Sequence, residues 1–181
     1  MADPTLLTIS GALRKDSYNR MLLAEAARAF GPAQVIEADL HLPLYDGDLE
    51  DAQGVPDGVH RLVEQIAAAD AVVISSPEYN KGITGVLKNA LDWLSRVKEN
   101  PFKAKPTVVM SANAGRTGGE AGQFMLLACL MSYHQPDVLP GPMLCVAAAG
   151  DEFDAQGRLT NDHYLKLLSG KMQALRDRAA G

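Results

Sequence analysis

The sequence predicts an α/β fold in which a parallel β-sheet is covered by helices on both faces. Two observations carry this prediction. Five short apolar runs alternate from end to end with longer segments whose apolar residues recur at helical spacing. Most of these runs are apolar at consecutive positions, which is typical of strands buried on both faces.

The expected elements follow in order along the chain. After the first strand, "TLLTIS", apolar residues from Met21 to Phe30 recur with the period of a helix. The third strand, "DAVVISSP", is strongly β-branched, which favours extended backbone. Residues 41–58 are rich in Asp, Gly and Pro and are expected to form a long loop. The strands are expected at 5–10, 33–40, 70–77, 106–113 and 142–150, and the helices at 21–30, 59–69, 84–97, 119–133 and 160–180.

Length and composition indicate one domain that covers residues 1–181. The chain is 47% apolar and 22% charged, and no repeat or change of composition divides it. No apolar run reaches the roughly 18 residues that span a bilayer, and the N-terminus lacks the basic start of a signal peptide. We therefore expect no membrane partner and a cytoplasmic location. The net charge of −5 argues against nucleic acid as a partner, because phosphate backbones need a clustered positive surface.

The cysteines and histidines give no sign of a metal site. Cys129 and Cys145 lie in apolar surroundings without a CxxC spacing, and we expect both to be buried reduced thiols. The four histidines are scattered and form no HxH or HExxH pattern.

Three polar loops follow the first, third and fourth expected strands. We call them loop 1 (10–19), loop 3 (75–85) and loop 4 (111–122). In a parallel sheet the carboxyl ends of the strands share one edge, where ligands bind near the point at which the strand order reverses. The three loops are therefore expected to form the walls of one site.

Loop 1, "SGALRKDSYN", has neither a GxGxxG nor a GxxxxGK[ST] pattern. Ser17 stands where the N-cap of the next helix would fall, and Arg14 precedes it. A phosphate there would gain free backbone N–H groups, the helix dipole and a charged partner. The alternative is a capped helix beside a solvated arginine.

Loops 3 and 4 suit a flat, hydrogen-bonding ligand. Pro77 has no N–H and fixes φ, so the donors that follow can face outward. Tyr79 can lie against a ring, and Asn80 can donate to its carbonyl edge. Loop 4, "SANAGRTGGEAG", is rich in glycine, which permits close approach of the main chain, and Arg116 can meet a second anion. The alternatives are an ordinary turn with Thr84 as N-cap and a flexible surface loop.

Two of these stretches resemble motifs of the NAD(P)H-dependent FMN reductases, a family that also includes quinone, chromate and azo-compound reductases. The first family motif is approximately GSLRxxSxN, and loop 1 ends on "LRKDSYN". The second is PEYNxxxPGxLKNAIDWxSR, and this chain has "PEYNKGITGVLKNALDWLSR". Thr84 replaces the family's usual proline, and Glu120 and Gly122 stand in a stretch where the family often has "RAQ".

The resemblance implies a flavodoxin-like three-layer sandwich with a five-stranded parallel sheet of order 2-1-3-4-5. It implies FMN as cofactor and NAD(P)H as co-substrate, with hydride passing through flavin N5 to a quinone, free flavin, chromate or azo-type small-molecule acceptor. No nucleophile, base or paired carboxylate is evident in the sequence, so no catalytic side chain is expected, and Glu78 is expected to have a positional role. The implied cofactor-binding residues are Ser10, Arg14, Ser17 and Asn19 at the phosphate, Pro77, Glu78, Tyr79 and Asn80 at the ring, and Ser111, Asn113 and Gly115 closing the site.

The resemblance also implies a homodimer or homotetramer, with the helix of "LKNALDWLSR" near the interface. From the sequence alone Trp93 is equally a core residue, and Lys88, Asp92 and Arg96 can form a solvated row of ion pairs. Two other functions compete with the reductase: a non-enzymatic electron carrier of flavodoxin type and a nucleotide-handling transferase. Steady NAD(P)H turnover without a partner reductase would exclude the carrier, and flavin binding would exclude the transferase.

Overall fold

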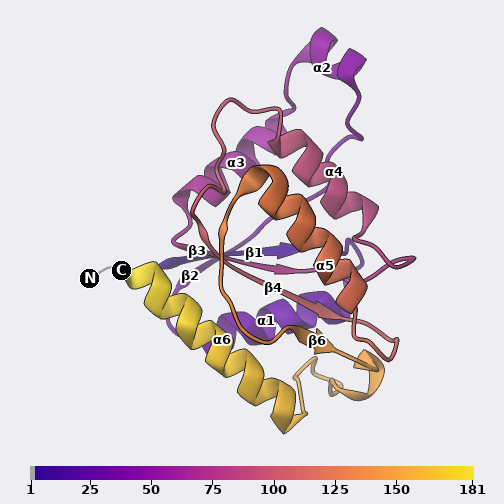
Figure 1. Ribbon diagram of the computed structural model, residues 1–181, viewed down its shortest axis with the longest axis vertical. Helices are drawn as coiled ribbons and strands as arrows, with labels where there is room; N and C mark the ends of the chain where they lie inside the picture. Colours follow the sequence, from indigo (N-terminus) through magenta and orange to yellow (C-terminus); the bar gives the residue numbers. More distant parts are fainter. Residues whose placement is uncertain (1–2) are drawn as a thin grey trace.

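The computed structural model describes residues 3–181 and contains a parallel sheet between two layers of helices (Figure 1). The strand order is β2-β1-β3-β4-β5, and the short strand β6 also pairs with β4. This confirms the predicted fold and order. The strands are β1 (Thr5–Ser10), β2 (Gln34–Glu37), β3 (Ala71–Ser75), β4 (Pro106–Ala112), β5 (Asp137–Val138) and β6 (Leu144–Val146).

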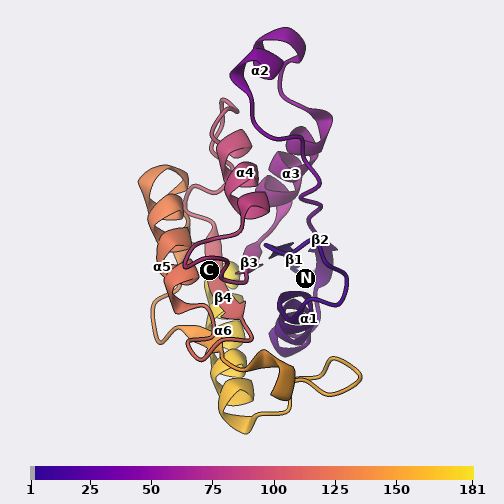
Figure 2. The same ribbon diagram turned by 90° about the vertical axis from the view of Figure 1, so that its right-hand side faces the viewer.

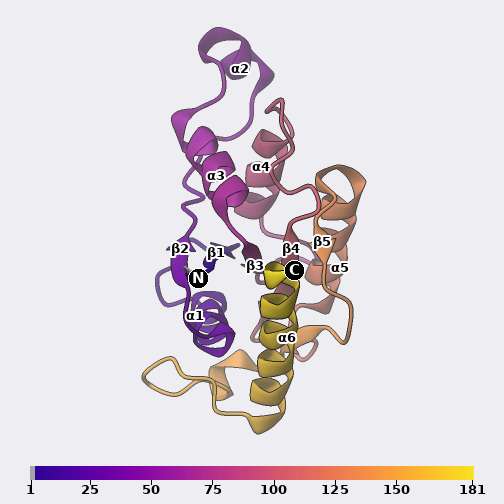
Figure 3. The same cartoon turned by 90° about the vertical axis from the view of Figure 1, so that its left-hand side faces the viewer.

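The helices divide between the two faces of the sheet, and each face has its own apolar core. On one face α1 and α6 pack together over residues such as Leu6, Val73 and Met110. On the other, α3, α4 and α5 cover Leu7, Ile9 and Ile74 (Figures 2 and 3). The helices are α1 (Tyr18–Phe30), α2 (Gly47–Gln53), α3 (Asp57–Ala68), α4 (Gly85–Leu94), α5 (Glu120–Cys129) and α6 (Asp162–Ala180), with a π-helical turn at Leu130–His134 and a 3-10 turn at Ala149–Asp151.

The fifth strand position differs from the prediction. The expected strand at 142–150 is only the three residues of β6, and the two-residue β5 precedes it on the same edge of β4. Between β5 and β6 the chain leaves the sheet, through a segment that holds Pro140, Gly141 and Pro142. Proline has no backbone N–H for a strand ladder, so this part of the run cannot pair as expected.

The expected loop at 41–58 contains a helix that the sequence pattern did not indicate. Helix α2 projects away from the rest of the molecule (Figure 1). Asp46 caps it, because its carboxylate accepts a hydrogen bond from the N–H of Asp48 at 3.0 Å. None of its residues is buried, so it has no apolar stripe that periodicity could reveal.

The predicted caps are confirmed, and so is one of the two alternatives for Trp93. Ser17 caps α1 and accepts from the N–H of Asn19, and Thr84 caps α4 and accepts from Leu87. Trp93 is fully buried within the chain, and its indole N–H donates to the carbonyl of Pro43 at 2.8 Å. This bond attaches α4 to the segment that leads into α2.

The charged row on α4 is only partly as expected. Lys88 pairs with Asp92, but Arg96 turns to Glu50 of α2, with 2.9 Å between Nε and Oε2.

The two cysteines are free thiols, but each is only half-buried, contrary to the expectation of full burial. Burial nevertheless raises the pKa of Cys145.

Within residues 3–181 no helix is both long and apolar enough to cross a membrane.

One buried side chain joins the start of α1 to the ends of two strands. Asn19 is 2% exposed, and its Nδ2 donates to the carbonyl of Ala112 at 2.8 Å. Its Oδ1 accepts from the N–H of Ala112 at 3.0 Å and from the Ser75 hydroxyl at 2.9 Å. The amide therefore holds α1 against the carboxyl ends of β3 and β4.

Replacing Asn19 with Ala leaves buried donors and acceptors on β3 and β4 without partners. We expect Asn19→Ala to lower the free energy of unfolding by about 2–4 kcal/mol, since each unpaired buried group costs about 1–3 kcal/mol. Ser17→Ala, which removes only the cap of the same helix, should cost about 1 kcal/mol. Urea denaturation of the two variants compares them directly, and equal losses would contradict the role given to Asn19.

Candidate functional site

Loops 1, 3 and 4 gather at one edge of the sheet, as the sequence predicted. In Figure 1 the strands start on the side where both chain ends lie and finish on the opposite side. The parallel pairing of β1 with β3 and of β3 with β4 places the loops that follow them next to one another. All predicted site residues therefore lie along this edge.

Loop 1 is held close to β3 and leaves its arginine free. Gly11 donates its N–H to the carbonyl of Ser75 at 2.8 Å, and a Cβ at Gly11 would lie only 2.3 Å from the Ser76 hydroxyl. Only glycine fits this contact. Ser10 is buried, and its hydroxyl bonds within the loop to Ala12. Arg14 is exposed and has no hydrogen-bond or ion-pair partner in the described part of the chain.

The start of α1 adds backbone donors to this exposed cation. The first turn of a helix leaves N–H groups without partners inside the helix. The Ser17 side chain satisfies that of Asn19, and the Ser17 carbonyl accepts from Met21. Within residues 3–181 the N–H groups of Tyr18 and Arg20 have no acceptor, so the helix end keeps donors for an anion.

Loop 3 begins at the buried Pro77 and continues as a tight hairpin. Tyr79 and Gly82 exchange two backbone hydrogen bonds of 3.0 Å, and the two residues between them, Asn80 and Lys81, have φ of 51° and 66°. Positive φ at both central positions defines a type I′ turn, which asparagine tolerates better than most residues. The turn holds Tyr79 outward with 57% of its surface exposed.

Glu78 connects loop 3 to the N-terminus of α5. Its carboxylate accepts a 3.1 Å hydrogen bond from the N–H of Gly122 and lies 3.2 Å from the Lys81 ammonium. Burial alone would raise the pKa of Glu78, but the Gly122 N–H and Lys81 together hold it below its usual value. The carboxylate is therefore ionised at neutral pH, at the helix end that favours negative charge.

Asn113 connects loop 3 to loop 4. Its Oδ1 accepts from the N–H of Glu78 at 3.3 Å, and its Nδ2 donates to the carbonyl of Glu78 at 3.2 Å. Its own backbone bonds on the other side to Val146 and Ala149. The two loops are thus fixed to each other and to the segment after β6.

Loop 4 needs glycine where its backbone packs closely against other parts of the chain. Gly118 has φ of 62°, and a Cβ there would lie 2.6 Å from the backbone of Cys145. Ser111 is fully buried, donates to the carbonyl of Gly118 at 2.6 Å and accepts from Gln123 at 2.7 Å. The Gly115 carbonyl accepts from the N–H of Ala148, while Gly115 itself is exposed beside Arg116.

The predicted site residues therefore fall into two groups. The first group is occupied by protein contacts and fixes the loops: Ser10, Ser17, Asn19, Pro77, Glu78, Ser111 and Asn113. The second group presents groups to solvent at the loop surfaces: Arg14, Tyr79, Asn80 and Gly115.

A hollow beside loop 1 was not foreseen from the sequence. It has a volume of about 630 Å³ and lies between Leu13, the segment 40–44 and the start of α4. Four of its nine lining residues are leucines, and Gly85, Val86 and Asn89 come from α4. Leucines in a segment expected to be a loop gave no signal for it, because only the fold brings them next to loop 1.

No group of three His, Cys, Asp or Glu residues within residues 3–181 is placed to hold a metal ion.

Comparison with known proteins shows the family to which the chain is related. The family described as NADPH-dependent FMN reductase matches residues 4–151. An NAD(P)H-dependent FMN reductase from Pseudomonas aeruginosa is 43% identical over 175 residues, which cover 96% of this chain and 94% of that protein. A quinone reductase from Escherichia coli K12 is 35% identical over 173 residues, covering 93% and 92% of the two chains.

A solved structure extends the likeness to the whole fold. FerB, a flavoenzyme NAD(P)H:(acceptor) oxidoreductase from Paracoccus denitrificans, superposes with a TM-score of 0.86 at 29% identity, covering 98% of this chain and 97% of that one. The matched range includes all three loops of the sheet edge. The chain belongs to the NADPH-dependent FMN reductase family.

Proposed function

We propose that this chain is a single-domain, FMN-dependent NAD(P)H oxidoreductase that passes electrons to a quinone or another small acceptor. The observation that carries the proposal is the division of polar groups at the sheet edge. Buried side chains fix loops 1, 3 and 4, while Arg14 and the N–H groups of Tyr18 and Arg20 have no partner among residues 3–181. A cation beside unpaired backbone donors is suited to a phosphate.

The residues present fit FMN in charge and shape. The phosphate would lie at Arg14 and the N-terminus of α1, and the flat ring would lie along Pro77 to Asn80, bordered by Asn113 and Gly115. Ser17 and Asn19 fix the helix end, and Ser10 and Ser111 fix the adjoining loops. When bound, FMN would supply the hydride chemistry, accepting from NAD(P)H at N5 and then reducing the acceptor.

In the reaction, the chain's own residues would hold the flavin in place and stabilise negative charge on its ring. The Tyr79–Gly82 hairpin and the Glu78–Asn113 bonds fix the backbone of loop 3 and occupy the N–H groups of Glu78 and Tyr79, contrary to the expectation that these donors face outward. Within residues 3–181 the N–H groups of Asn80 and Lys81 have no acceptor, and in this fixed turn they need little reorganisation to stabilise negative charge on a ring. The ionised Glu78 is committed to Gly122 and Lys81, which leaves it no role as a base.

The acceptor we favour is a quinone, with free flavin, chromate and azo compounds as further acceptors. The hollow lined by Leu13, Leu42 and Leu44 offers an apolar surface next to loop 1, which suits a flat uncharged ring. A cytoplasmic location would give the site access to NAD(P)H.

We also propose a homodimer or homotetramer. Leu44 is 79% exposed, and Phe124 and Met131, on and just after α5, are 57% and 56% exposed. Large apolar side chains of this kind on a small chain favour contact with another copy.

The purified chain tests the proposed activity directly. We expect it to bind FMN and then to oxidise NADPH steadily with menadione as acceptor and no other protein present. The measurement is the fall of NADPH absorbance against a control without FMN. FMN binding without such turnover would point to an electron carrier, and no FMN binding would overturn the proposal.

Arg14→Ala tests the phosphate site. We expect the affinity for FMN to fall by about 1.5–3 kcal/mol, the value of a hydrogen bond to a charged group, which is tenfold or more. The affinity for riboflavin, which has no phosphate, should stay the same. Fluorescence titration with both flavins gives the comparison, and Lys15→Ala, which removes the next exposed cation, is the control. An equal loss for both flavins would contradict a phosphate contact at Arg14.

Glu78→Ala tests the support of loop 3. The substitution frees loop 3 from α5, so we expect FMN and riboflavin to lose affinity by the same factor, in contrast to Arg14→Ala. Glu78→Gln keeps an acceptor for the Gly122 N–H and should restore part of the affinity. Hydrogen exchange at the Gly122 amide, followed by NMR, should quicken in Glu78→Ala. Unchanged exchange would show that the carboxylate does not hold the two segments together.

A further inference from the structure

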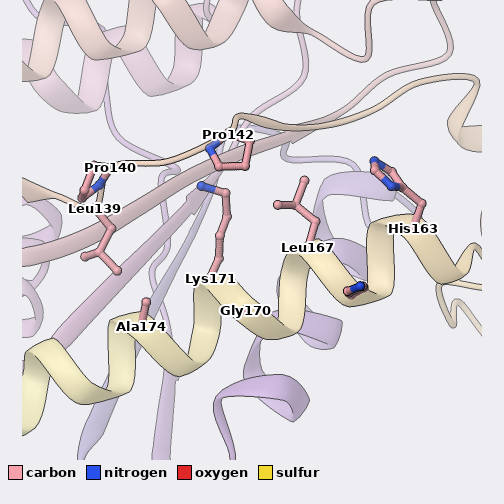
Figure 4. Close-up of a pocket in the computed structure, with 9 residues that line it drawn as sticks. Leu139, Pro140, Pro142, His163, Leu167, Gly170, Lys171 and Ala174 are labelled. Carbon is pink, nitrogen blue, oxygen red and sulfur yellow. The ribbon is translucent and has the colours of Figure 1, made fainter.

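A groove lined by α6 shares no residue with loops 1, 3 and 4 and so is not part of the proposed flavin site. It lies between α6 and the segment Leu139–Pro142 and has a volume of about 500 Å³ (Figure 4). The interruption of the fifth strand position creates it. Five residues, 139–143, lie between β5 and β6, whereas only Val108 and Val109 separate their pairing partners on β4. The extra length carries the chain out of the sheet and leaves space against α6.

The helix side of the groove is kept open by small residues. Gly170 and Ala174 lie one turn apart on the face of α6 that lines it, next to Leu167. A glycine inside a helix lowers its stability relative to alanine. A Cβ at Gly170 would meet no atom within 4 Å, so packing within the chain does not require glycine there. Its effect on the structure is to keep the groove wide.

The ionisable residues that line the groove are all basic. His163, Lys166 and Lys171 line it, and no carboxylate does. Lys171 is half-buried and extends from α6 across the groove toward Pro142 (Figure 4). Within residues 3–181 it has no hydrogen bond and no ion pair. Burial lowers the pKa of Lys171, and the nearby Cys145 partly opposes this effect.

The Lys171 ammonium lies among apolar walls without an anionic partner. Moving a charge out of water is costly unless an opposite charge accompanies it. Leu139, Leu167 and the two prolines supply apolar surface along the groove, and proline contributes no N–H to that wall. The lining residues of α6 extend from His163 to Ala174, about 16 Å at 1.5 Å per residue. The groove is therefore elongated and largely apolar, and its two lysines, the exposed Lys166 and the half-buried Lys171, have no partner among residues 3–181.

We propose that this groove binds a small amphipathic carboxylate with an extended apolar chain. The carboxylate pairs with Lys171, and Lys166 adds a second positive charge to the lining of the groove. The apolar chain lies along Gly170 and Leu167, the part of the α6 wall between Lys171 and His163 (Figure 4). The proposal does not depend on the flavin site, because none of the residues of loops 1, 3 and 4 lines the groove.

Isothermal titration calorimetry of the full chain with sodium decanoate tests the proposal. We expect saturable binding at one site, and decyltrimethylammonium, which has the same chain and the opposite charge, should not bind. Lys171→Met keeps an unbranched side chain but removes the charge, and we expect it to weaken decanoate binding at least tenfold. Gly170→Leu fills the groove and should abolish binding, whereas its matched control Gly170→Ala should retain it. Circular dichroism confirms that each variant is folded.

Three results would overturn the proposal. The first is equal binding of the two probes, which would mean that charge plays no part. The second is unchanged decanoate binding in Lys171→Met. The third is no saturable binding of decanoate. If Gly170→Leu then also changes the oligomeric state, measured by analytical ultracentrifugation, the groove is a contact between copies of the chain.

Discussion

The buried amide of Asn19 is the interaction on which the arrangement of the sheet edge depends. It bonds to both backbone groups of Ala112 and to the hydroxyl of Ser75, two residues that end neighbouring strands. Because the protein interior offers no water to replace these partners, the start of α1 has one position relative to β3 and β4. Loop 1 leads into that helix, so its geometry follows from the same contact.

The other loops are fixed by the same kind of device, a polar side chain that satisfies backbone groups of a distant segment. Asn113 does this for Glu78, Glu78 for the N-terminus of α5, and Ser111 for Gly118. The exposed side chains of the loops do not take part in such contacts. A site binds a cofactor without rearranging when buried side chains fix its loops and hydrogen-bond donors at the loop surface are free to bind the ligand.

Much of the fold followed from the sequence because the periodicity of buried strands and amphipathic helices is local. The cap at Ser17 was predictable for the same reason. Helix α2 was not, since it buries no residue, and β5 was not, since two residues become a strand only beside the edge of β4. The motifs indicated which loops form the site, but they could not show that Asn19 faces Ala112, 93 residues away. The contacts of the candidate residues with a flavin stay predictions.

The broken fifth strand position also affects how the molecule meets its neighbours in a crowded solution. A long open strand at the edge of a sheet attracts strands from other molecules, and the result is aggregation. Here that edge consists of two short pieces, and the prolines between them withhold N–H groups at the place where a ladder would continue. An approaching strand finds no continuous row of donors and acceptors on this side of the sheet.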